Sequence, residues 1–201
     1  MARPPPRLVV ATGNAGKLAE LQAALGALAT EIVSQAQLRV PPVEETEATF
    51  EGNALLKARH CARATGAAAL ADDSGLEVDA LGGAPGVRSA RFAGDAASDR
   101  DNIDKLIRSL AGVPPPRRAR YRAVLVLLTG PDDPAPLVAR GVWEGQIVQA
   151  PRGTGGFGYD PLFEPLDDHR TVAELAPEEK ARRSHRAQAL AALISLWQAR
   201  R

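Results

Sequence analysis

This sequence is poor in the residues that build disulfides and zinc sites, and it has no long hydrophobic run. It contains one cysteine, Cys61, so an internal disulfide is excluded. The three histidines, His60, His169 and His185, are too scattered to match the ligand spacing of a zinc site. The longest apolar run, residues 123–128, is far too short to cross a bilayer.

An excess of charge of one sign is lacking too, because 25 basic and 24 acidic residues leave a net charge of +1. This balance provides no overall field that would attract nucleic acid or anionic lipid, so neither is expected as a partner. Residues 1–6, which read Met-Ala-Arg-Pro-Pro-Pro, lack the apolar core of a signal peptide. We therefore expect a cytoplasmic protein without membrane association.

Strand patterns alternate with helix patterns, which predicts a single α/β domain over residues 1–201. Strands are predicted at residues 8–11, 32–33, 67–71, 76–81 (or a hairpin return), 121–128 and 138–148 (one strand or two). Helices are predicted from Gly16 through Leu18, Leu21, Leu25 and Leu28, at about 49–65, after Ser98 with its capping partner Asp101, and at about 177–199.

Two adjacent carboxylates follow the short apolar run 67–71. Asp72 and Asp73, with Ser74 and Gly75 behind them, are predicted to lie on a tight turn at the end of a buried strand. Buried carboxylates are costly unless they are paired, hydrogen-bonded or holding a metal. The pair therefore indicates a Mg²⁺ site or a general base.

A glycine-containing turn, residues 12–17 (Thr-Gly-Asn-Ala-Gly-Lys), separates the first strand from the first helix. Backbone N–H groups and the positive end of the helix dipole can hold a phosphate there, and Lys17 adds a charge. The turn is not a P-loop, because its glycine spacing is too short and Leu18 stands where a Mg²⁺-binding Ser or Thr should follow. An ordinary turn with a solvated lysine is the alternative.

Residues 153–158 (Gly-Thr-Gly-Gly-Phe-Gly) contain a formal G-x-G-x-x-G, but Pro161 follows closely where the dinucleotide fingerprint requires a helix. The loop instead suits close approach to a flat ligand, with Phe157 and Tyr159 available to stack on a base. A structural turn with core aromatics is the alternative.

Basic residues crowd the first half of the last predicted helix: Lys180, Arg182, Arg183, His185 and Arg186. Cations near a helix N-terminus oppose the helix dipole, so their placement indicates a role in ligand binding. A solvated helix face is the alternative, and Lys57 on the helix at 49–65 has the same two interpretations.

Six motifs in order along the chain carry a resemblance to a known family. They are Thr12-Gly13-Asn14-x-x-Lys17, Glu51-Gly52-Asn53-Ala54-x-x-Lys57-Ala58, Ala71-Asp72-Asp73-Ser74-Gly75-Leu76, Gly82-Gly83-Ala84-Pro85-Gly86-Val87-x-Ser89-Ala90-Arg91, Gly153 to Pro161, and Lys180-x-x-x-Ser184-His185-Arg186. The chain resembles the inosine triphosphate pyrophosphatase family, the house-cleaning noncanonical purine NTP pyrophosphatases, from Val9 to about Leu196.

The resemblance implies a Mg²⁺-dependent homodimer with an elongated mixed α/β sheet, flanking helices and two lobes around a central nucleotide cleft. Such an enzyme hydrolyses ITP, dITP and XTP to the monophosphate and pyrophosphate, cleansing the nucleotide pool. This cleavage needs an activated water and a cation that absorbs developing charge, which agrees with the carboxylate pair.

The resemblance also implies roles for individual residues. Asp73 is the general base and a Mg²⁺ ligand, and Glu44 completes the metal site, with Glu45 or Asp72 as alternatives. The triphosphate is expected to contact Thr12, Gly13, Asn14, Ala15, Gly16, Lys17, Lys57 and Ser74. The base and sugar are expected to contact Phe157, Gly158, Tyr159, Asp160, Lys180, His185 and Arg186. Donors around O6 of hypoxanthine or xanthine would be left unpaired by adenine, at roughly 1–3 kcal/mol per group.

Two other functions remain open. A nucleotide- or nucleic-acid-binding module without catalysis would use the glycine loops and the basic helix, but it has no need of Asp72 and Asp73. A pyrophosphatase for another altered nucleotide, such as a modified pyrimidine, would share the catalytic residues. Pyrophosphate release from ITP tests the first alternative, and a panel of nucleotides tests the second.

Overall fold

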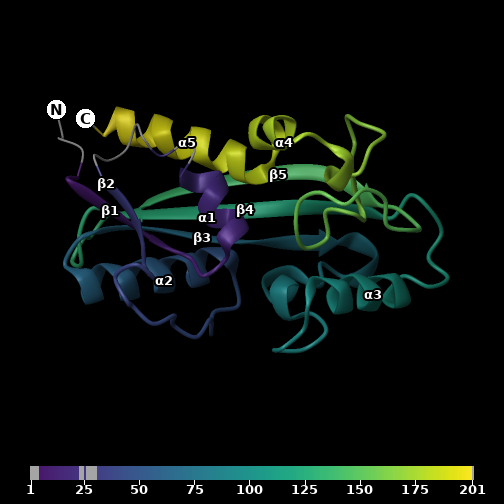
Figure 1. Ribbon diagram of the computed structural model, residues 1–201, viewed down its shortest axis with the longest axis horizontal. Coiled ribbons are helices and arrows are strands. Elements are labelled where there is room, and N and C mark those ends of the chain that lie inside the picture. The colour runs from purple at the N-terminus through teal and green to yellow at the C-terminus, as the bar shows by residue number, and fades with distance from the viewer. Residues whose placement is uncertain (1–4, 23–24, 26–30, 201) are drawn as a thin grey trace. The chain divides into compact units, whose positions relative to one another are not determined.

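The computed structural model describes residues 5–22, 25 and 31–200, and its strands form a six-stranded mixed sheet in the order β2-β1-β3-β4-β5-β6 (Figure 1). The strands are β1 (Arg7–Ala11), β2 (Glu31–Ser34), β3 (Ala68–Val78), β4 (Arg118–Leu128), β5 (Leu137–Ile147) and β6 (Phe163–Pro165). β1 pairs in parallel with β2 and β3, whereas β5 and β6 are antiparallel. The predicted α/β class with a mixed sheet is confirmed.

The helices around these strands are α1 (Ala15–Gln22), α2 (Phe50–Thr65), α3 (Asp99–Ser109), α4 (Pro177–Arg183) and α5 (His185–Ala199), with short 3₁₀ helices η2 (Asp79–Leu81), η3 (Gly86–Arg91) and η4 (Val172–Glu174). None of the helices in the described part of the chain has the length and apolar character needed to span a membrane. Leu28, predicted to lie in the first helix, falls outside the described residues.

The chain divides into two compact units, and each has its own hydrophobic core. Unit 1 contains the described residues of Met1–Asp73, Ala123–Gly141 and Arg186–Arg201, and unit 2 contains Ser74–Arg122 and Val142–His185. The divisions fall within β3, β4 and β5. The nucleotide cleft between two lobes stays a prediction.

In unit 1, α2 lies on one face of the strands, and α1 and α5 lie on the other (Figure 1). Leu8 of β1 and Leu70 of β3 belong to a buried cluster with Leu21 of α1 and Leu193 of α5. Side chains alternate along a strand, so the intervening residues point to the α2 face. This alternation decides which face of the sheet each of the adjacent carboxylates Asp72 and Asp73 occupies.

Local signals set both ends of α2 and the start of α3 as predicted. Thr49 caps α2, because its hydroxyl accepts a hydrogen bond from Gly52 N, and the helix ends at Gly66, whose φ of 66° is left-handed. Ser98 and Asp101 form the predicted capping box of α3. In unit 2 this helix contributes Ile103 and Leu106 to the buried core.

The predicted turn at residues 72–75 and the hairpin return at 76–81 are wrong. β3 is one continuous strand of 11 residues from Ala68 to Val78, buried through most of its length. The strand continues through Asp72 and Asp73 because each carboxylate meets a cation on its own face of the sheet. No turn to solvent is then required.

The single helix predicted over residues 177–199 is also wrong, because Ser184 adopts extended geometry (φ −62°, ψ 158°) and separates α4 from α5. Lys180, Arg182 and Arg183 therefore occupy the last turn of α4, where cations complement the helix dipole. These three residues do not oppose the helix dipole, contrary to the prediction. Arg186, by contrast, lies in the first turn of α5.

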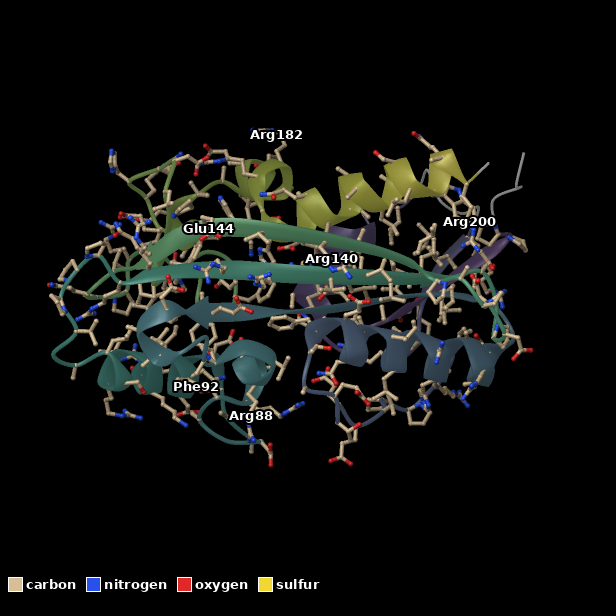
Figure 2. All side chains as sticks on the ribbon, turned by 180° about the vertical axis from the view of Figure 1, so that it is seen from behind. Arg88, Phe92, Arg140, Glu144, Arg182 and Arg200 are labelled. Carbon is tan, nitrogen blue, oxygen red and sulfur yellow. The ribbon has the colours of Figure 1, made fainter. Side chains whose placement is uncertain are left out.

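The segment predicted as one strand or two over residues 138–148 forms the single strand β5, in which buried and exposed residues alternate along much of its length. Figure 2 shows Arg140 and Glu144 along this strand, and both side chains are exposed. Ala139 and Trp143, which directly precede these two exposed residues, are buried, as expected for a strand with one face in a core.

Candidate active site

Asp72 and Asp73 are adjacent in β3, and strand alternation sends them to opposite faces of the sheet. Asp72 is 1% exposed and Asp73 is 5% exposed. Two carboxylates on one face would have to share a metal or a proton. Here they form separate ion-pair groups, both within unit 1.

The Asp72 group holds two cations against one buried carboxylate. Lys17 Nζ lies 2.7 Å from Asp72 Oδ1, and Arg186 Nε lies 2.9 Å from Asp72 Oδ2. A second nitrogen of Arg186 forms an ion pair with Glu20. Burial alone would raise the pKa of Asp72, but Arg186 and Lys17 outweigh it and hold that pKa well below its usual range. Both oxygens of Asp72 are thus engaged with cations.

The Asp73 group lies on the α2 face. Lys57 Nζ bridges two carboxylates, at 2.7 Å from Asp73 Oδ1 and 2.9 Å from Glu45 Oε1. Burial lowers the pKa of Lys57, yet Asp73 and Glu45 outweigh this and raise it, so the ammonium stays protonated. Burial raises the pKa of Asp73, and Lys57 opposes this only in part. Asp73 Oδ2 is buried and has no hydrogen-bond partner among the described residues.

These residues fit a divalent cation held in part by a substrate. Asp73 and Glu45 supply the oxygen ligands that Mg²⁺ prefers, and the buried Asp73 Oδ2 is an atom that needs a partner. Within the described ranges, no group of three or more His, Cys, Asp or Glu residues is arranged to hold a metal. Mg²⁺ is commonly bound through one or two carboxylates plus substrate phosphates, which two carboxylates satisfy.

Among the three residues weighed as the second metal ligand, the structure places Glu45 with Asp73. Glu44 is exposed, whereas Glu45 is half-buried and shares Lys57 with Asp73. Asp72 points to the other face of the strand and pairs with Lys17 and Arg186. The geometry therefore favours Glu45.

The predicted phosphate turn leads from β1 into α1. Asn14 N donates to Thr12 Oγ1 at 3.2 Å, and Lys17 N donates to Asn14 Oδ1 at 2.9 Å, so Asn14 caps the helix. Gly13 and Asn14 are exposed, Ala15 begins α1, and Gly16 follows. The solvated-lysine alternative is wrong, because Lys17 pairs with buried Asp72, and burial lowers its pKa.

In unit 2, three groups converge on the buried carboxylate of Asp160. Tyr121 OH donates at 3.2 Å, Lys180 Nζ at 2.7 Å and the backbone N–H of Phe157 at 2.9 Å. A Cβ at Gly156 would lie 2.0 Å from Asp160 Oδ2. Only glycine therefore allows the loop to lie this close to the Asp160 carboxylate. The Lys180 ammonium also lies 4.2 Å from the Phe157 ring centroid.

The other predicted base-contacting residues of unit 2 differ in their surroundings. The His185 ring stacks on Tyr121 with centroids 4.7 Å apart. Tyr159 is buried in the core and its hydroxyl donates to Ser89 O at 2.8 Å, which leaves its ring enclosed instead of available for stacking. Gly158 N donates to Asp99. Ser74, the first residue of unit 2, is half-buried.

The structure therefore divides the residues that were predicted to surround the base. Lys180 and His185 belong to unit 2 with Asp160 and Tyr121, whereas Arg186 belongs to unit 1 and pairs with Asp72. The sequence placed these residues together because they share one motif.

Two site residues went unrecognised in the sequence. Glu20 lies three residues after Lys17 on α1, so both face the same side of the helix, and this spacing could have identified it as part of the ion-pair group. Tyr121 was predicted only as the start of a strand. A buried tyrosine hydroxyl needs a hydrogen-bond partner, but the sequence does not show that this partner is Asp160.

The chain is similar to known proteins over nearly its whole length. Residues 8–196 match the model of the Ham1 family. A dITP/XTP pyrophosphatase from Methylococcus capsulatus is 55% identical over 190 residues, covering 94% of each chain, and one from Xanthomonas campestris pv. campestris is 56% identical over 187 residues, covering 92% of this chain and 94% of that one. A HAM1 protein from Coxiella burnetii superposes with a TM-score of 0.88 and 47% identity, over 96% of this chain and 98% of that chain. The predicted resemblance is confirmed, and the chain belongs to the Ham1 family.

Proposed function

We propose that this protein hydrolyses noncanonical purine nucleoside triphosphates, namely ITP, dITP and XTP, to the monophosphate and pyrophosphate. The observation that carries the proposal is the Asp73 group: a buried carboxylate with one unpartnered oxygen, beside Glu45 and Lys57. The names of the family members with 55% and 56% identity, dITP/XTP pyrophosphatase, support the substrate class.

Asp73 accepts a proton from the attacking water. The water oxygen bonds to the α-phosphorus, the bond from that phosphorus to the bridging oxygen breaks, and pyrophosphate leaves. Burial raises the pKa of Asp73, which makes it a better proton acceptor than an exposed aspartate. When bound, Mg²⁺ supplies positive charge that offsets the charge developing on the phosphate oxygens. Asp73 and Glu45 would hold it.

The triphosphate is bound by residues of unit 1. The turn at residues 12–16 presents backbone N–H groups at the start of α1, where an anion is favoured. Lys17 and Lys57 are half-buried cations already held in place by Asp72 and Asp73. Because every nucleoside triphosphate carries the same phosphates, these residues provide affinity without base selectivity.

Base selection belongs to residues of unit 2. Lys180 is a buried cation beside the Phe157 ring, and His185 is a buried imidazole on the Tyr121 ring. Donors of this kind suit the 6-oxo group of hypoxanthine and xanthine, whereas the amino group of adenine is itself a donor and cannot accept a hydrogen bond from them. Arg186 was predicted to join them; its ion pairs with Asp72 and Glu20 support a second role, which is to hold Lys17 through Asp72.

A cytoplasmic homodimer is part of the same proposal, supported by the family resemblance. Light scattering on the purified chain measures the mass, and a monomer would contradict this part alone.

Pyrophosphate release from a panel of ITP, XTP, dITP, dUTP, GTP and ATP, with and without Mg²⁺, tests the function. We expect kcat/KM for ITP to exceed that for ATP by at least about 100-fold and activity to vanish in EDTA. Release of orthophosphate would contradict the proposed bond cleavage, preference for dUTP would indicate an altered pyrimidine as substrate, and binding without release would indicate a module without catalysis.

A further inference from the structure

Glu45 lies on a segment that has no regular structure of its own. Residues 40–49 form neither helix nor strand, yet Glu45 must stay near Asp73 for the two carboxylates to act together. An irregular segment keeps its position through its contacts with neighbouring elements. The contacts that hold this one are therefore part of the site.

A direct attachment is made by the side chain of Asn53, in the first part of α2. Asn53 is 1% exposed, its Oδ1 accepts a hydrogen bond from Glu47 N at 3.0 Å, and its Nδ2 donates to Glu47 O at 3.2 Å. The amide thus satisfies both backbone groups of one residue, two positions after Glu45. Losing it would leave these polar groups without partners.

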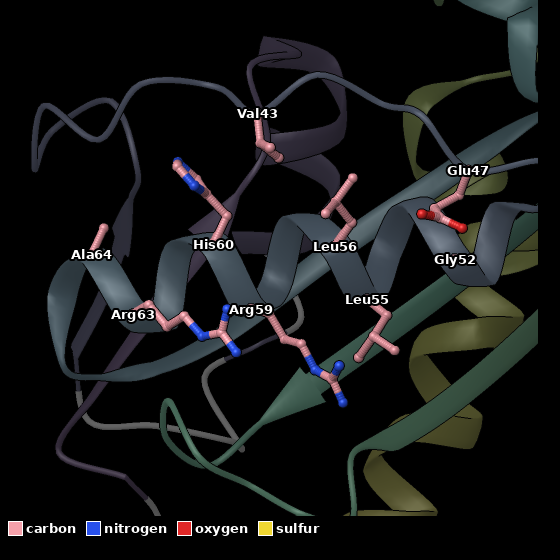
Figure 3. A pocket seen from close by; sticks show the side chains of 9 residues that line it. All are labelled: Val43, Glu47, Gly52, Leu55, Leu56, Arg59, His60, Arg63 and Ala64. Carbon is pink, nitrogen blue, oxygen red and sulfur yellow. The ribbon is translucent and has the colours of Figure 1, made fainter.

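The neighbouring glycine allows this close approach. A Cβ at Gly52 would lie 2.7 Å from Glu47 Cβ, at the base of that side chain, so the segment could not keep its place. Figure 3 shows Glu47 beside Gly52 at the start of α2. Gly52 and Asn53 together fit the segment against the helix.

A pocket lies between the segment and α2. Its volume is about 730 Å³, and it is lined by Val43 and Glu47 of the segment and by residues of the helix (Figure 3). Farther along, His60 Nε2 lies 2.8 Å from Pro41 O. The segment is therefore held beside α2 by polar contacts at Pro41 and Glu47, with the ion pair between Glu45 and Lys57 lying between them.

We propose that Asn53 is a positioning residue for the divalent cation: by fixing Glu47 it holds Glu45 at the Asp73 group. The inference rests on the proposed function, because it assumes that Asp73 and Glu45 bind the cation. Asn53 touches neither the cation nor the substrate, and Lys17 and Asp72 lie on the other face of β3. Its loss should weaken cation binding and leave phosphate recognition by Lys17 unchanged.

Mn²⁺ titrated into the full chain without nucleotide, followed by electron paramagnetic resonance, measures cation binding independently of activity. Asn53→Ala should raise the Kd for Mn²⁺ by at least about 10-fold, as is typical when support for a metal ligand is lost. The amide of Glu47 should also exchange with solvent faster. Saturating Mg²⁺ should restore kcat to within a few-fold, because the ligands themselves remain.

Asn102 offers a matched control in unit 2. It occupies the same position in α3 as Asn53 does in α2, is 3% exposed, accepts from Ala93 N at 2.8 Å and donates to Ala90 O at 3.2 Å. Asn102→Ala removes an equivalent pair of hydrogen bonds and should leave the Kd for Mn²⁺ within two-fold of wild type.

Gly52→Ala displaces the same segment but keeps Asn53, and alanine favours the helix. This variant tests whether the position of the segment controls cation binding if Asn53→Ala does not fold. We expect it to weaken Mn²⁺ binding as well. A folded Asn53→Ala or Gly52→Ala protein with wild-type Mn²⁺ affinity would overturn the role of Asn53 alone. A wild-type chain that binds no Mn²⁺, either alone or with a non-hydrolysable ITP analogue present, would overturn the proposed cation site and, with it, this inference.

Discussion

Replacing Asp72 by asparagine should destabilise unit 1 far more than its single lost charge suggests. The Asp72 side chain is fully buried, and those of Lys17 and Arg186 are 16% and 3% exposed. The substitution keeps the shape of the side chain but leaves two largely buried cations facing a neutral amide. Of the ion pairs in this group, the one between Arg186 and Glu20 remains. Removing one partner of a buried ion pair typically costs about 3–5 kcal/mol of unfolding free energy.

Urea unfolding at pH 7 measures this loss. The chain has two tryptophans, and Trp197 lies in the core of unit 1 whereas Trp143 lies in that of unit 2. A Trp143→Phe background makes Trp197 fluorescence a report on unit 1. As a control, Glu31→Gln removes the 2.8 Å pair with Arg7, in which both side chains are 49% exposed, and should change stability little.

The pH dependence has a definite sign. The folded-state pKa of Asp72 is lowered, so its stabilising contribution is present above the unfolded pKa of about 3.9 and is lost as pH falls through the folded value. The difference between wild type and Asp72→Asn should therefore persist at neutral pH and narrow below about pH 4. If Asp72→Asn is no less stable than Glu31→Gln, the ion-pair group does not stabilise unit 1 and this reasoning is refuted.

Four further substitutions separate the proposed roles. Asp73→Asn should bind nucleotide but lose about 10²–10⁴-fold in kcat, since it removes the base; activity within a few-fold of wild type would contradict that role. Lys57→Ala should raise KM for ITP and ATP alike, because both carry the same phosphates, and a changed ITP-to-ATP ratio would place it at the base. His185→Ala and Lys180→Ala should each lower kcat/KM for ITP by roughly 10–200-fold and that for ATP much less. Equal losses on both substrates would assign the two residues to the phosphates or the fold.

The sequence by itself determined the elements whose signals are local. Thr49 caps the start of α2 and Gly66 its end, and Ser98 with Asp101 caps the start of α3. Such caps are predictable because they depend on residues within one turn of the helix. The six motifs, taken in order along the chain, likewise identified the family without reference to any contact. These features depend on residues that are close together in the chain, so they can be predicted from the sequence.

Only the tertiary structure decided how the charges are paired. Asp72 and Asp73 read as one carboxylate pair until the alternation of β3 placed them on opposite faces. Arg186 reads as part of a base-binding motif, yet it meets Asp72 from 114 residues away. Which cation neutralises which buried carboxylate depends on elements that the fold brings together. Partners so far apart in the sequence cannot be matched from the sequence alone.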